Sequence, residues 1–311
     1  MTANLFRKIG KKIKSVLTWE LLVAQDEMRQ ELKYQTKLII SQIEIGQRLL
    51  SLKYTDIYKN TPELLPAINE TGFRVHSQFD EDGYLLYIFS IIGTTTKTSI
   101  EIGTGNGTEC NSSNLIIYHG WKGMLIDGNE KNVKQGQLFF ANNPNVVINE
   151  PRFVHSLVTK DNVNGLISSN GFIGDVDLLS IDIDGNDYYI LEAISCISPR
   201  VIICEINNAI PLDLPLTIPY KEDFFNTWDK EYPENSFISM SLCAANKLMK
   251  SKGYRLVAAN RMGFNVIFMR NDTGNDIFPE ISLEAARGNF INHKEMSELW
   301  DSLKNYPWVT V

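Results

Sequence analysis

The stretch from Thr98 to Asp127 constrains the fold of this chain more than any other, because it reads as a strand, a glycine-containing loop, a helix and a second strand. The loop holds Gly103, Gly105 and Gly107, where the missing Cβ atoms permit tight turns and the close approach of a ligand. A helix is expected directly after it, over residues 111–119. An isolated glycine loop also occurs at ordinary strand-to-helix turns, so the loop alone leaves a purely structural role open.

Asp127 ends the second strand of this unit, twenty residues after Gly107. A carboxylate at this position accepts hydrogen bonds from ribose hydroxyls in nucleotide-binding folds, so we expect a nucleoside ligand. The loop has Thr108 where the dinucleotide pattern G-x-G-x-x-G requires a third glycine, which disfavours a diphosphate. Glu101, two residues before the first glycine, would also repel a diphosphate but would attract an ammonium and a sulfonium. S-adenosylmethionine is a nucleoside that fits these charges.

Strands and helices alternate along most of the remaining chain, which predicts an α/β fold with a doubly wound, Rossmann-like, mostly parallel sheet of seven strands. A helix over residues 77–92, with Ser77 as its N-cap, precedes the glycine-loop strand. The two closing strands are separated by Gly263 and are expected to be antiparallel. The other expected helices cover residues 130–142, 160–168, 186–197 and 236–251, and the other expected strands cover residues 146–148, 176–183, 201–206, 254–260 and 265–269.

Carboxylates follow the apolar strand at 176–183, where Asp182, Asp184 and Asp187 lie within six residues. Ligands of open α/β sheets bind outside the carboxyl ends of the strands, so these side chains are expected at the ligand site. Asp182 and Asp184 should point to one face of an extended chain. Two carboxylates so close repel each other unless a proton, a metal ion or a cationic ligand lies between them. Asp187 is expected to cap the next helix.

The neighbouring strand ends in Glu205 and Asn207, whose side chains are expected to converge with the two aspartates at the same edge of the sheet. The segment 207–235 follows and contains many proline and aromatic residues. It is too long to be a plain connector. We expect this segment to cover the pocket of an acceptor substrate. Of the four histidines, only His155 lies near a strand end, and no two histidines have metal-ligand spacing.

Composition limits the class of protein and its partners. The 311 residues are 43% hydrophobic, which suits one α/β domain with extensions. Four cysteines without a C-x-x-C pair indicate reduced thiols and a cytoplasmic location. Residues 20–311 carry 25 basic and 37 acidic side chains, a formal net charge of −12, which excludes nucleic acid as the main partner. No apolar run reaches membrane-spanning length, which also argues against a secretory signal peptide.

The N-terminal region predicts a helical extension, residues 1–70, before an α/β domain at 71–270 and a C-terminal helical tail at 271–311. Residues 4–18 form a basic amphipathic helix, which suits peripheral contact with the inner face of an anionic membrane; packing on its own domain or fraying is the alternative. Residues 19–58 have helical spacing, which predicts a long helix or a helical hairpin able to form a homo-oligomer.

Six motifs occur in order along the chain: SQFDEDG at 77–83, EIGTGNG at 101–107, GWKGMLIDG at 120–128, LLSIDIDGNDYYI at 178–190, PRVIICEIN at 199–207 and KGY at 252–254. Together they resemble the FkbM-like group of class I S-adenosylmethionine-dependent methyltransferases. This resemblance covers about residues 73–270 and implies the methyl donor as cofactor, with Gly103, Gly105 and Asp127 at the cofactor and Asp182 near the transferred methyl. It also implies an acceptor hydroxyl on a sugar or natural product, and a link to surface-polysaccharide biosynthesis. Asp184 and Asp187 replace the glutamates of the DVEGAE-like motif in that group.

The sequence therefore predicts an O-methyltransferase that acts on a small-molecule or glycan acceptor. Asp182 or Asp184 would accept the hydroxyl proton or hold a divalent cation such as Mg²⁺, with Glu205 as a third metal ligand that orients the acceptor. Cofactor contacts are expected from Glu101, Gly103, Gly105, Asp127 and Asp182. Two alternatives stay open: a noncatalytic nucleoside-binding module or scaffold recruited to membranes, and a nicotinamide oxidoreductase.

Overall fold

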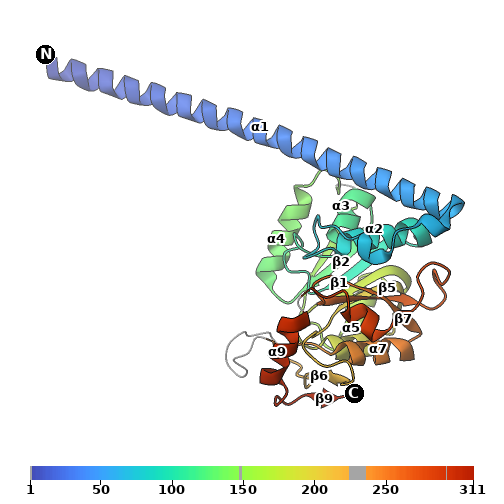
Figure 1. The fold of residues 1–311 in the computed structure, drawn as a ribbon. Coiled ribbons are helices and arrows are strands. Elements are labelled where there is room, and N and C mark those ends of the chain that lie inside the picture. Colours follow the sequence, from blue (N-terminus) through green and yellow to red (C-terminus); the bar gives the residue numbers. More distant parts are fainter. Residues whose placement is uncertain (1, 147–148, 224–235, 292) are drawn as a thin grey trace. The chain divides into compact units, whose positions relative to one another are not determined.

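A computed structural model describes the backbone of residues 2–146, 149–223, 236–291 and 293–311; the side chains of residues 2–17 and 293 are not described. The chain divides into two compact units, Met1–Lys53 and Tyr54–Val311. Helix α1 (Thr2–Asn60) supplies all the described residues of the first unit and ends at Asn60 in the second (Figure 1). It is one continuous helix, so the hairpin alternative is wrong. The domain boundaries expected near residues 70 and 270 stay predictions.

The second unit contains a seven-stranded sheet in the order β3-β2-β1-β4-β5-β8-β7. The first five strands are parallel, and β8 is antiparallel to both of its neighbours. This arrangement confirms the predicted fold class and its antiparallel closing pair. The strands are β1 (Thr98–Ile102), β2 (Lys122–Asp127), β3 (Arg152–His155), β4 (Gly174–Ile181), β5 (Ile197–Glu205), β7 (Tyr254–Ala259) and β8 (Asn265–Arg270).

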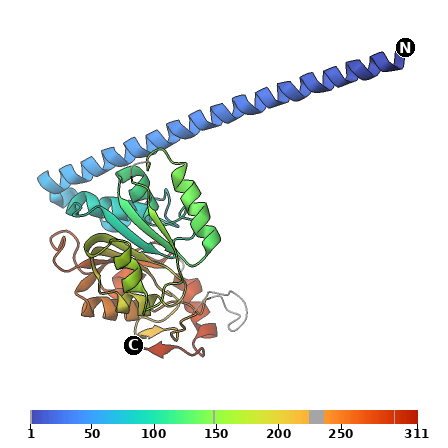
Figure 2. The ribbon, with the colours of Figure 1, turned by 180° about the vertical axis from the view of Figure 1, so that it is seen from behind.

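Helices flank this sheet on both faces (Figures 1 and 2). A separate two-stranded sheet pairs β6 (Leu216–Thr217) with β9 (Val309–Thr310), so the predicted C-terminal helical tail also contains a strand. The remaining helices are η1 (Pro62–Leu64), η2 (Ile68–Glu70), α2 (Glu81–Ile92), α3 (Ser113–His119), α4 (Glu130–Ala141), α5 (Val163–Ser169), α6 (Asp187–Ala193), α7 (Leu242–Ser251), α8 (Leu283–Arg287) and α9 (His293–Leu303).

The sheet core is apolar on both faces, as expected for parallel strands covered by helices. Ile102 of β1 pairs with Ile126 of β2 and Ile181 of β4, and Ile181 pairs with Cys204 of β5. All four side chains are buried. This register aligns the carboxyl ends of four strands. The chain order reverses between β1 and β4, and such a switch point is where open α/β sheets bind their ligands.

Helices α2 and α7 begin well after their predicted starts at residues 77 and 236, and serine side chains explain both differences. Helix α2 begins at Glu81, because the Ser77 hydroxyl accepts the N–H of Asp82 and Oδ2 of Asp82 accepts three backbone N–H groups of residues 75–77, which holds that segment as a turn. Helix α7 begins at Leu242, because Ser241 is its N-cap and its side chain accepts the N–H of Ala244. Asp80 therefore occupies the N-cap position predicted for Ser77, although the Ser77 hydroxyl accepts one N–H of the first turn.

Other predicted boundaries change as well. Helix α6 ends at Ala193, because Ile197 already begins β5. The third strand along the chain, β3, lies later than the strand expected over residues 146–148. Residues 147–148 of that expected strand lie outside the described residues. Within the described ranges, no helix is both long and apolar enough to cross a bilayer.

Candidate functional site

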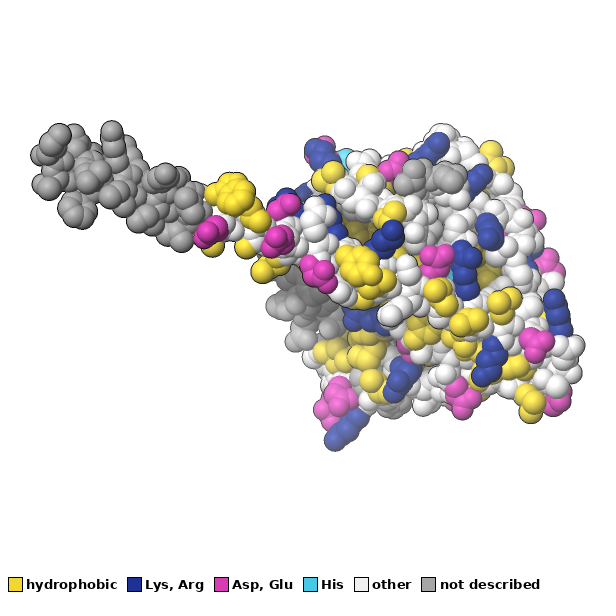
Figure 3. Space-filling view, turned by 90° about the horizontal axis from the view of Figure 1, so that it is seen from above, with side chains coloured by type: hydrophobic (Ala, Val, Ile, Leu, Met, Phe, Trp, Pro, Cys, Tyr) yellow, Lys and Arg dark blue, Asp and Glu magenta, His cyan; other side chains and the backbone are white. Residues whose placement is uncertain are grey.

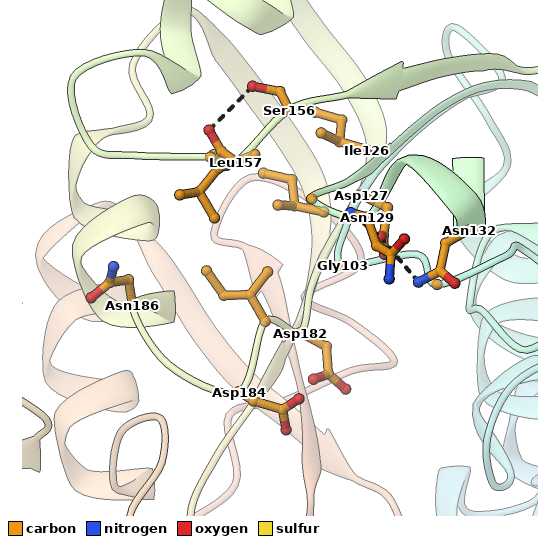
Figure 4. Close-up of a pocket in the computed structure, with 15 residues that line it drawn as sticks. Gly103, Ile126, Asp127, Asn129, Asn132, Ser156, Leu157, Asp182, Asp184 and Asn186 are labelled. Atoms are coloured by element: carbon orange, nitrogen blue, oxygen red, sulfur yellow. Dashed lines mark hydrogen bonds between the residues drawn. The ribbon is translucent and has the colours of Figure 1, made fainter. Parts of the chain in front are cut away.

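A pocket of about 370 Å³ lies at the carboxyl ends of β1, β2 and β4, at the switch point of the sheet (Figure 4). It places the expected cofactor residues Gly103, Gly105 and Asp127 and the expected catalytic residues Asp182 and Asp184 around one cavity. The other residues that line it are Ile102, Ile126, Gly128, Asn129, Asn132, Ser156, Leu157, Val158, Ile183 and Asn186.

The three loop glycines have different physical reasons to be glycine. Gly103 has a φ of +88°, and a Cβ atom there would overlap the backbone carbonyl of Asp182. At Gly107, a Cβ would lie 2.9 Å from the ring of Phe140, so this position serves the packing of the loop on α4. Gly105 has a φ of +54°, but a Cβ there would meet no atom within 4 Å. Gly105 therefore borders the space that a ligand would occupy.

Asp127 at the end of β2 is held by its own loop. Its Oδ1 accepts the backbone N–H of Asn129 at 2.8 Å and the side-chain amide of Asn132 at 3.1 Å. Figure 4 shows these three residues together at one side of the pocket. No described residue donates to Oδ2 of Asp127, so this oxygen is available to a ribose hydroxyl.

Asp182, Asp184 and Glu205 lie together, and each offers a carboxylate oxygen within 4.8 Å of the other two. The extended chain predicted for the two aspartates is wrong, because β4 ends at Ile181 and Asp184 adopts a left-handed φ of 55°. A turn therefore brings the two side chains together (Figure 4), and the register of β4 with β5 places Glu205 beside them. Few residues other than glycine adopt this backbone conformation, which tends to be retained at functional sites.

The electrostatics of this carboxylate cluster, Asp182, Asp184 and Glu205, favour a bound positive charge or a proton. Burial raises the pKa of Asp182 well above its usual range, and the charges of Asp184 and Asp187 raise it further. Burial likewise raises the pKa of Glu205, and the charge of Asp182 adds to this. Glu205 is only 6% exposed, and its Oε2 has no hydrogen-bond partner among the described residues. An unpaired buried carboxylate oxygen is costly, so the arrangement suits a cation or a shared proton.

Glu101 has a different environment from the one predicted for a direct cofactor contact. Its side chain is 4% exposed and is not among the residues that line the pocket. Its Oε1 accepts the backbone N–H of Asn111 at 2.9 Å, and its Oε2 accepts that of Ser112 at 2.6 Å. Glu101 therefore holds the start of the α3 segment against β1, and its contact with the cofactor stays a prediction.

Asp187 and Asn207 serve the backbone around the site. Asp187 accepts the N–H groups of Ile183 at 3.0 Å and Gly185 at 2.9 Å, so it closes the preceding turn and does not cap α6 as predicted. Burial raises the pKa of Asp187 to about 6. Asn207 donates to the carbonyl oxygen of Ser236 and does not join the carboxylate cluster.

The other predicted site elements lie outside this pocket or outside the described residues. His155 is the last residue of β3, and one of its ring nitrogens lies 3.1 Å from the carbonyl oxygen of Gly128. Its side chain does not line the pocket. The segment predicted to cover the acceptor pocket includes residues 224–235, which lie outside the described residues.

Sequence reasoning missed the wall that follows β3, formed by Ser156, Leu157 and Val158, and also missed the amides of Asn129 and Asn132. The two asparagines had a readable signal, since they follow Asp127 within five residues in the first turn after a strand. The wall had no such signal, because a strand was expected at residues 146–148, whereas β3 ends at His155, directly before the wall.

No known family profile matches the chain, and no curated protein matches its sequence. Solved structures with a similar fold include an O-methyltransferase from Bacillus cereus in complex with S-adenosylhomocysteine (SAH), at 16% identity over 70% of this chain and 89% of that one, with a TM-score of 0.40. The SAH-bound N-terminal domain of EvdMO1 has 12% identity over 69% of this chain and 95% of that domain, with a TM-score of 0.39.

The mitomycin 7-O-methyltransferase MmcR is also similar, at 14% identity over 61% of this chain, with a TM-score of 0.37. This chain spans 53% of the length of MmcR. All three similarities concern the fold; two of these proteins are described as O-methyltransferases, and the EvdMO1 domain was solved with SAH bound.

Proposed function

We propose that this chain is an S-adenosylmethionine-dependent O-methyltransferase. The observation that carries the proposal is that a single pocket joins the glycine loop and Asp127 to Asp182 and Asp184. A methyltransferase needs this proximity, because the sulfonium and the acceptor hydroxyl must be held in line for displacement. The motifs at residues 77–254 that resemble FkbM-like methyltransferases support the same assignment.

In the proposed complex, the cofactor lies across the carboxyl ends of β1 and β2. Asp127 Oδ2 accepts a ribose hydroxyl, and the apolar side chains of Ile126, Leu157 and Val158 suit a planar base. The open space beside Gly105 accommodates the amino-acid portion, which directs the methyl group toward Asp182. The negative charge of Asp182 also attracts the sulfonium.

The acceptor hydroxyl is deprotonated at the carboxylate cluster. A divalent cation bound there would lower the pKa of the acceptor hydroxyl. The donor set fits a hard cation such as Mg²⁺ or Mn²⁺, because it consists of carboxylate oxygens only and Oε2 of Glu205 is unpaired. Asp182 or Asp184 accepts the hydroxyl proton, and Glu205 orients the acceptor.

Calorimetric titration of the full-length protein with SAH, ATP and NAD tests the cofactor assignment. Of the three ligands, only SAH should bind, with micromolar or tighter affinity. Binding of NAD but not SAH would indicate a nicotinamide oxidoreductase instead. SAH binding without methyl transfer to any acceptor would favour a noncatalytic nucleoside-binding module.

For the acceptor, we propose a hydroxyl of a sugar or surface-glycan precursor. The support is the resemblance of the motifs to a group whose members often methylate such hydroxyls. Transfer of a labelled methyl group from S-adenosylmethionine to a panel of nucleotide sugars, glycans and phenolic compounds tests this class. Labelling of phenols but not of sugars would contradict it.

We also propose that the N-terminal region contributes two further contacts. Residues 4–18 would bind the inner face of an anionic membrane; apart from residue 18, their side chains lie outside those that the structure describes. Residues 19–58 would form a homo-oligomer, and hydrophobic side chains gather on the surface of this helix (Figure 3). The large exposed ones are Trp19, Leu21, Leu22, Val23, Met28, Leu32, Tyr34, Leu38, Ile39, Ile45, Leu49 and Leu52.

Deleting residues 1–18 should reduce binding to anionic vesicles at low salt and leave SAH binding unchanged. Sedimentation of the full-length protein should show a concentration-dependent oligomer, which replacement of Leu38 and Ile45 by Ser should dissociate. A monomer at all concentrations would contradict the second contact.

A further inference from the structure

Asn265 is the first residue of β8 and lies directly opposite Glu205 in the antiparallel ladder with β5. Directly paired residues of two antiparallel strands project to the same face of the sheet, with Cβ atoms about 4.5–5.5 Å apart. Asn265 therefore stands beside Glu205, one of the three members of the carboxylate cluster. Its side chain is 2% exposed.

Glu81 determines which way the Asn265 amide is turned. A carboxylate only accepts hydrogen bonds, and Oε1 of Glu81 accepts from Nδ2 of Asn265 at 2.9 Å and from Nδ2 of Asn260 at 2.6 Å. Oε2 of Glu81 accepts the backbone N–H of Phe79 at 3.1 Å, so Glu81 is itself held in place. With Nδ2 directed at Glu81, the carbonyl oxygen of Asn265 occupies the opposite branch of the planar amide, away from Glu81.

That carbonyl oxygen has no partner. Oδ1 of Asn265 is buried and unpaired among the described residues, as is Oε2 of Glu205 on the opposite strand. Two unpaired acceptors stand on directly opposed residues, and Asp182 and Asp184 add their carboxylates beside Glu205. The backbone N–H of Asp184 donates to the Glu205 carboxylate, but oxygen acceptors still dominate this site. Burial of such groups costs free energy unless a positive charge or a donor lies between them.

We propose that Oδ1 of Asn265 is a further oxygen ligand of a divalent cation held by Asp182, Asp184 and Glu205, and that Glu81 is the positioning residue that directs this oxygen at the ion. The proposal rests on the metal-assisted version of the proposed function and adds a neutral ligand to its three carboxylates. Side-chain amide oxygens are common ligands of hard cations, and a neutral ligand limits repulsion in a set that is otherwise all anionic. Glu81 acts in the way that outer hydrogen-bond partners orient metal ligands.

The test measures Mn²⁺ binding to the full-length protein by electron paramagnetic resonance, with SAH affinity measured in parallel. The Asn265→Ala variant should bind Mn²⁺ at least about tenfold more weakly than the wild type, and Glu81→Gln should also weaken it about tenfold although every ligand is retained. A residue with no influence on the metal site would leave Mn²⁺ affinity unchanged when substituted, so weaker Mn²⁺ binding in Glu81→Gln supports the positioning role. SAH affinity should stay within about twofold in both variants.

Asn246 on α7 offers a matched control, because its amide oxygen is also buried and unpaired in the described part of the chain but lies on a helix outside the pocket. The Asn246→Ala variant should bind Mn²⁺ like the wild type. If Asn265→Ala does not fold, Glu81→Gln decides, and wild-type Mn²⁺ affinity in that variant overturns the inference.

Failure of the inference and failure of the proposed function give different results. Wild-type Mn²⁺ affinity in Asn265→Ala, together with loss of binding in Asp184→Asn, would overturn the role of Asn265 and leave the metal site intact. No Mn²⁺ binding by the wild-type protein would overturn both, while SAH binding would still report on the cofactor site.

Discussion

The glycine-loop end of the pocket and its carboxylate end differ in how their polar groups are satisfied. At the loop end, Asp127 accepts two hydrogen bonds from its own loop, and both oxygens of Glu101 accept backbone N–H groups. At the carboxylate end, Oε2 of Glu205 and Oδ1 of Asn265 have no partner within the described residues. At the loop end the chain supplies donors to both carboxylates and leaves only Oδ2 of Asp127 for a ligand, whereas the carboxylate end holds buried acceptors that need a bound cation or a proton.

This difference separates two kinds of effect. Substitutions at the loop end should act on stability and cofactor affinity, because they disturb contacts that the protein has already made. Substitutions at the carboxylate end should act on turnover and can even increase stability, because they remove repulsion. The following predictions test this separation.

The largest effect is expected for Asp182→Asn and Asp184→Asn. Each should lower turnover in the labelled methyl-transfer assay by roughly 10²–10⁴-fold, the usual contribution of a proton acceptor, because the amide cannot take the proton of the hydroxyl. SAH affinity, measured by calorimetry, should change by less than about tenfold. Full activity in both variants would move the acceptor chemistry away from this cluster.

The next effect is on stability at the loop end. Gly103→Ala should lower the free energy of unfolding in urea by roughly 2–5 kcal/mol, because a left-handed alanine costs about 1–2 kcal/mol and the overlap with the Asp182 carbonyl costs more. Gly105→Ala is the matched variant, since its Cβ meets no protein atom; it should lose SAH affinity with a smaller loss of stability. Equal destabilisation by both variants would contradict the different roles assigned to the two glycines.

A moderate effect is expected at Asp127. Asp127→Ala should weaken SAH binding by about 1–3 kcal/mol, because it removes a charge-assisted hydrogen bond to the ribose. The Asn129→Ala variant separates this from loop distortion, since it retains the carboxylate. Calorimetry that gives the same SAH affinity for Asp127→Ala and the wild type would remove Asp127 from the site.

The smallest effect concerns the pH dependence of stability. Burial, with the charges of Asp184 and Asp187, raises the pKa of Asp182 in the folded protein, so ionisation of Asp182 opposes folding. Asp182→Asn should therefore increase the free energy of unfolding of EDTA-treated protein at pH 8. The gain should vanish as the pH falls below about 4, where the carboxyl is protonated in both folded and unfolded chains.

Urea unfolding of the wild type and of Asp182→Asn from pH 4 to pH 8 provides the measurement. Saturating Mg²⁺ should reverse the order of the two proteins at pH 8, because the ion stabilises the wild-type cluster. A variant that is less stable than the wild type at every pH would show that Asp182 is satisfied without a ligand, and the comparison between the two ends would fail.

Local sequence patterns determined the fold class of this protein and the edge of the sheet predicted as its site. The alternation of strands and helices predicted the doubly wound sheet, and the glycines and acidic residues at strand ends predicted one edge as the site. These signals are readable because a strand, its loop and the next helix are neighbours in the chain, and because parallel strands end at a common edge. Helix ends were less predictable where side chains such as Ser77 and Asp82 make hydrogen bonds that compete with helical ones.

Only the tertiary structure decided how the carboxylate end is arranged. Asp184 joins Asp182 through a left-handed turn, and Glu81 reaches Asn265 across 184 residues of sequence. Neither contact has a local signal, because hydrogen bonds between distant side chains depend on strand register and on which helix covers the sheet edge. Residue types at the strand ends predicted where the polar groups of the site lie. The hydrogen bond between Glu81, at the start of α2, and Asn265, at the start of β8, determined which amide atom is left unpaired.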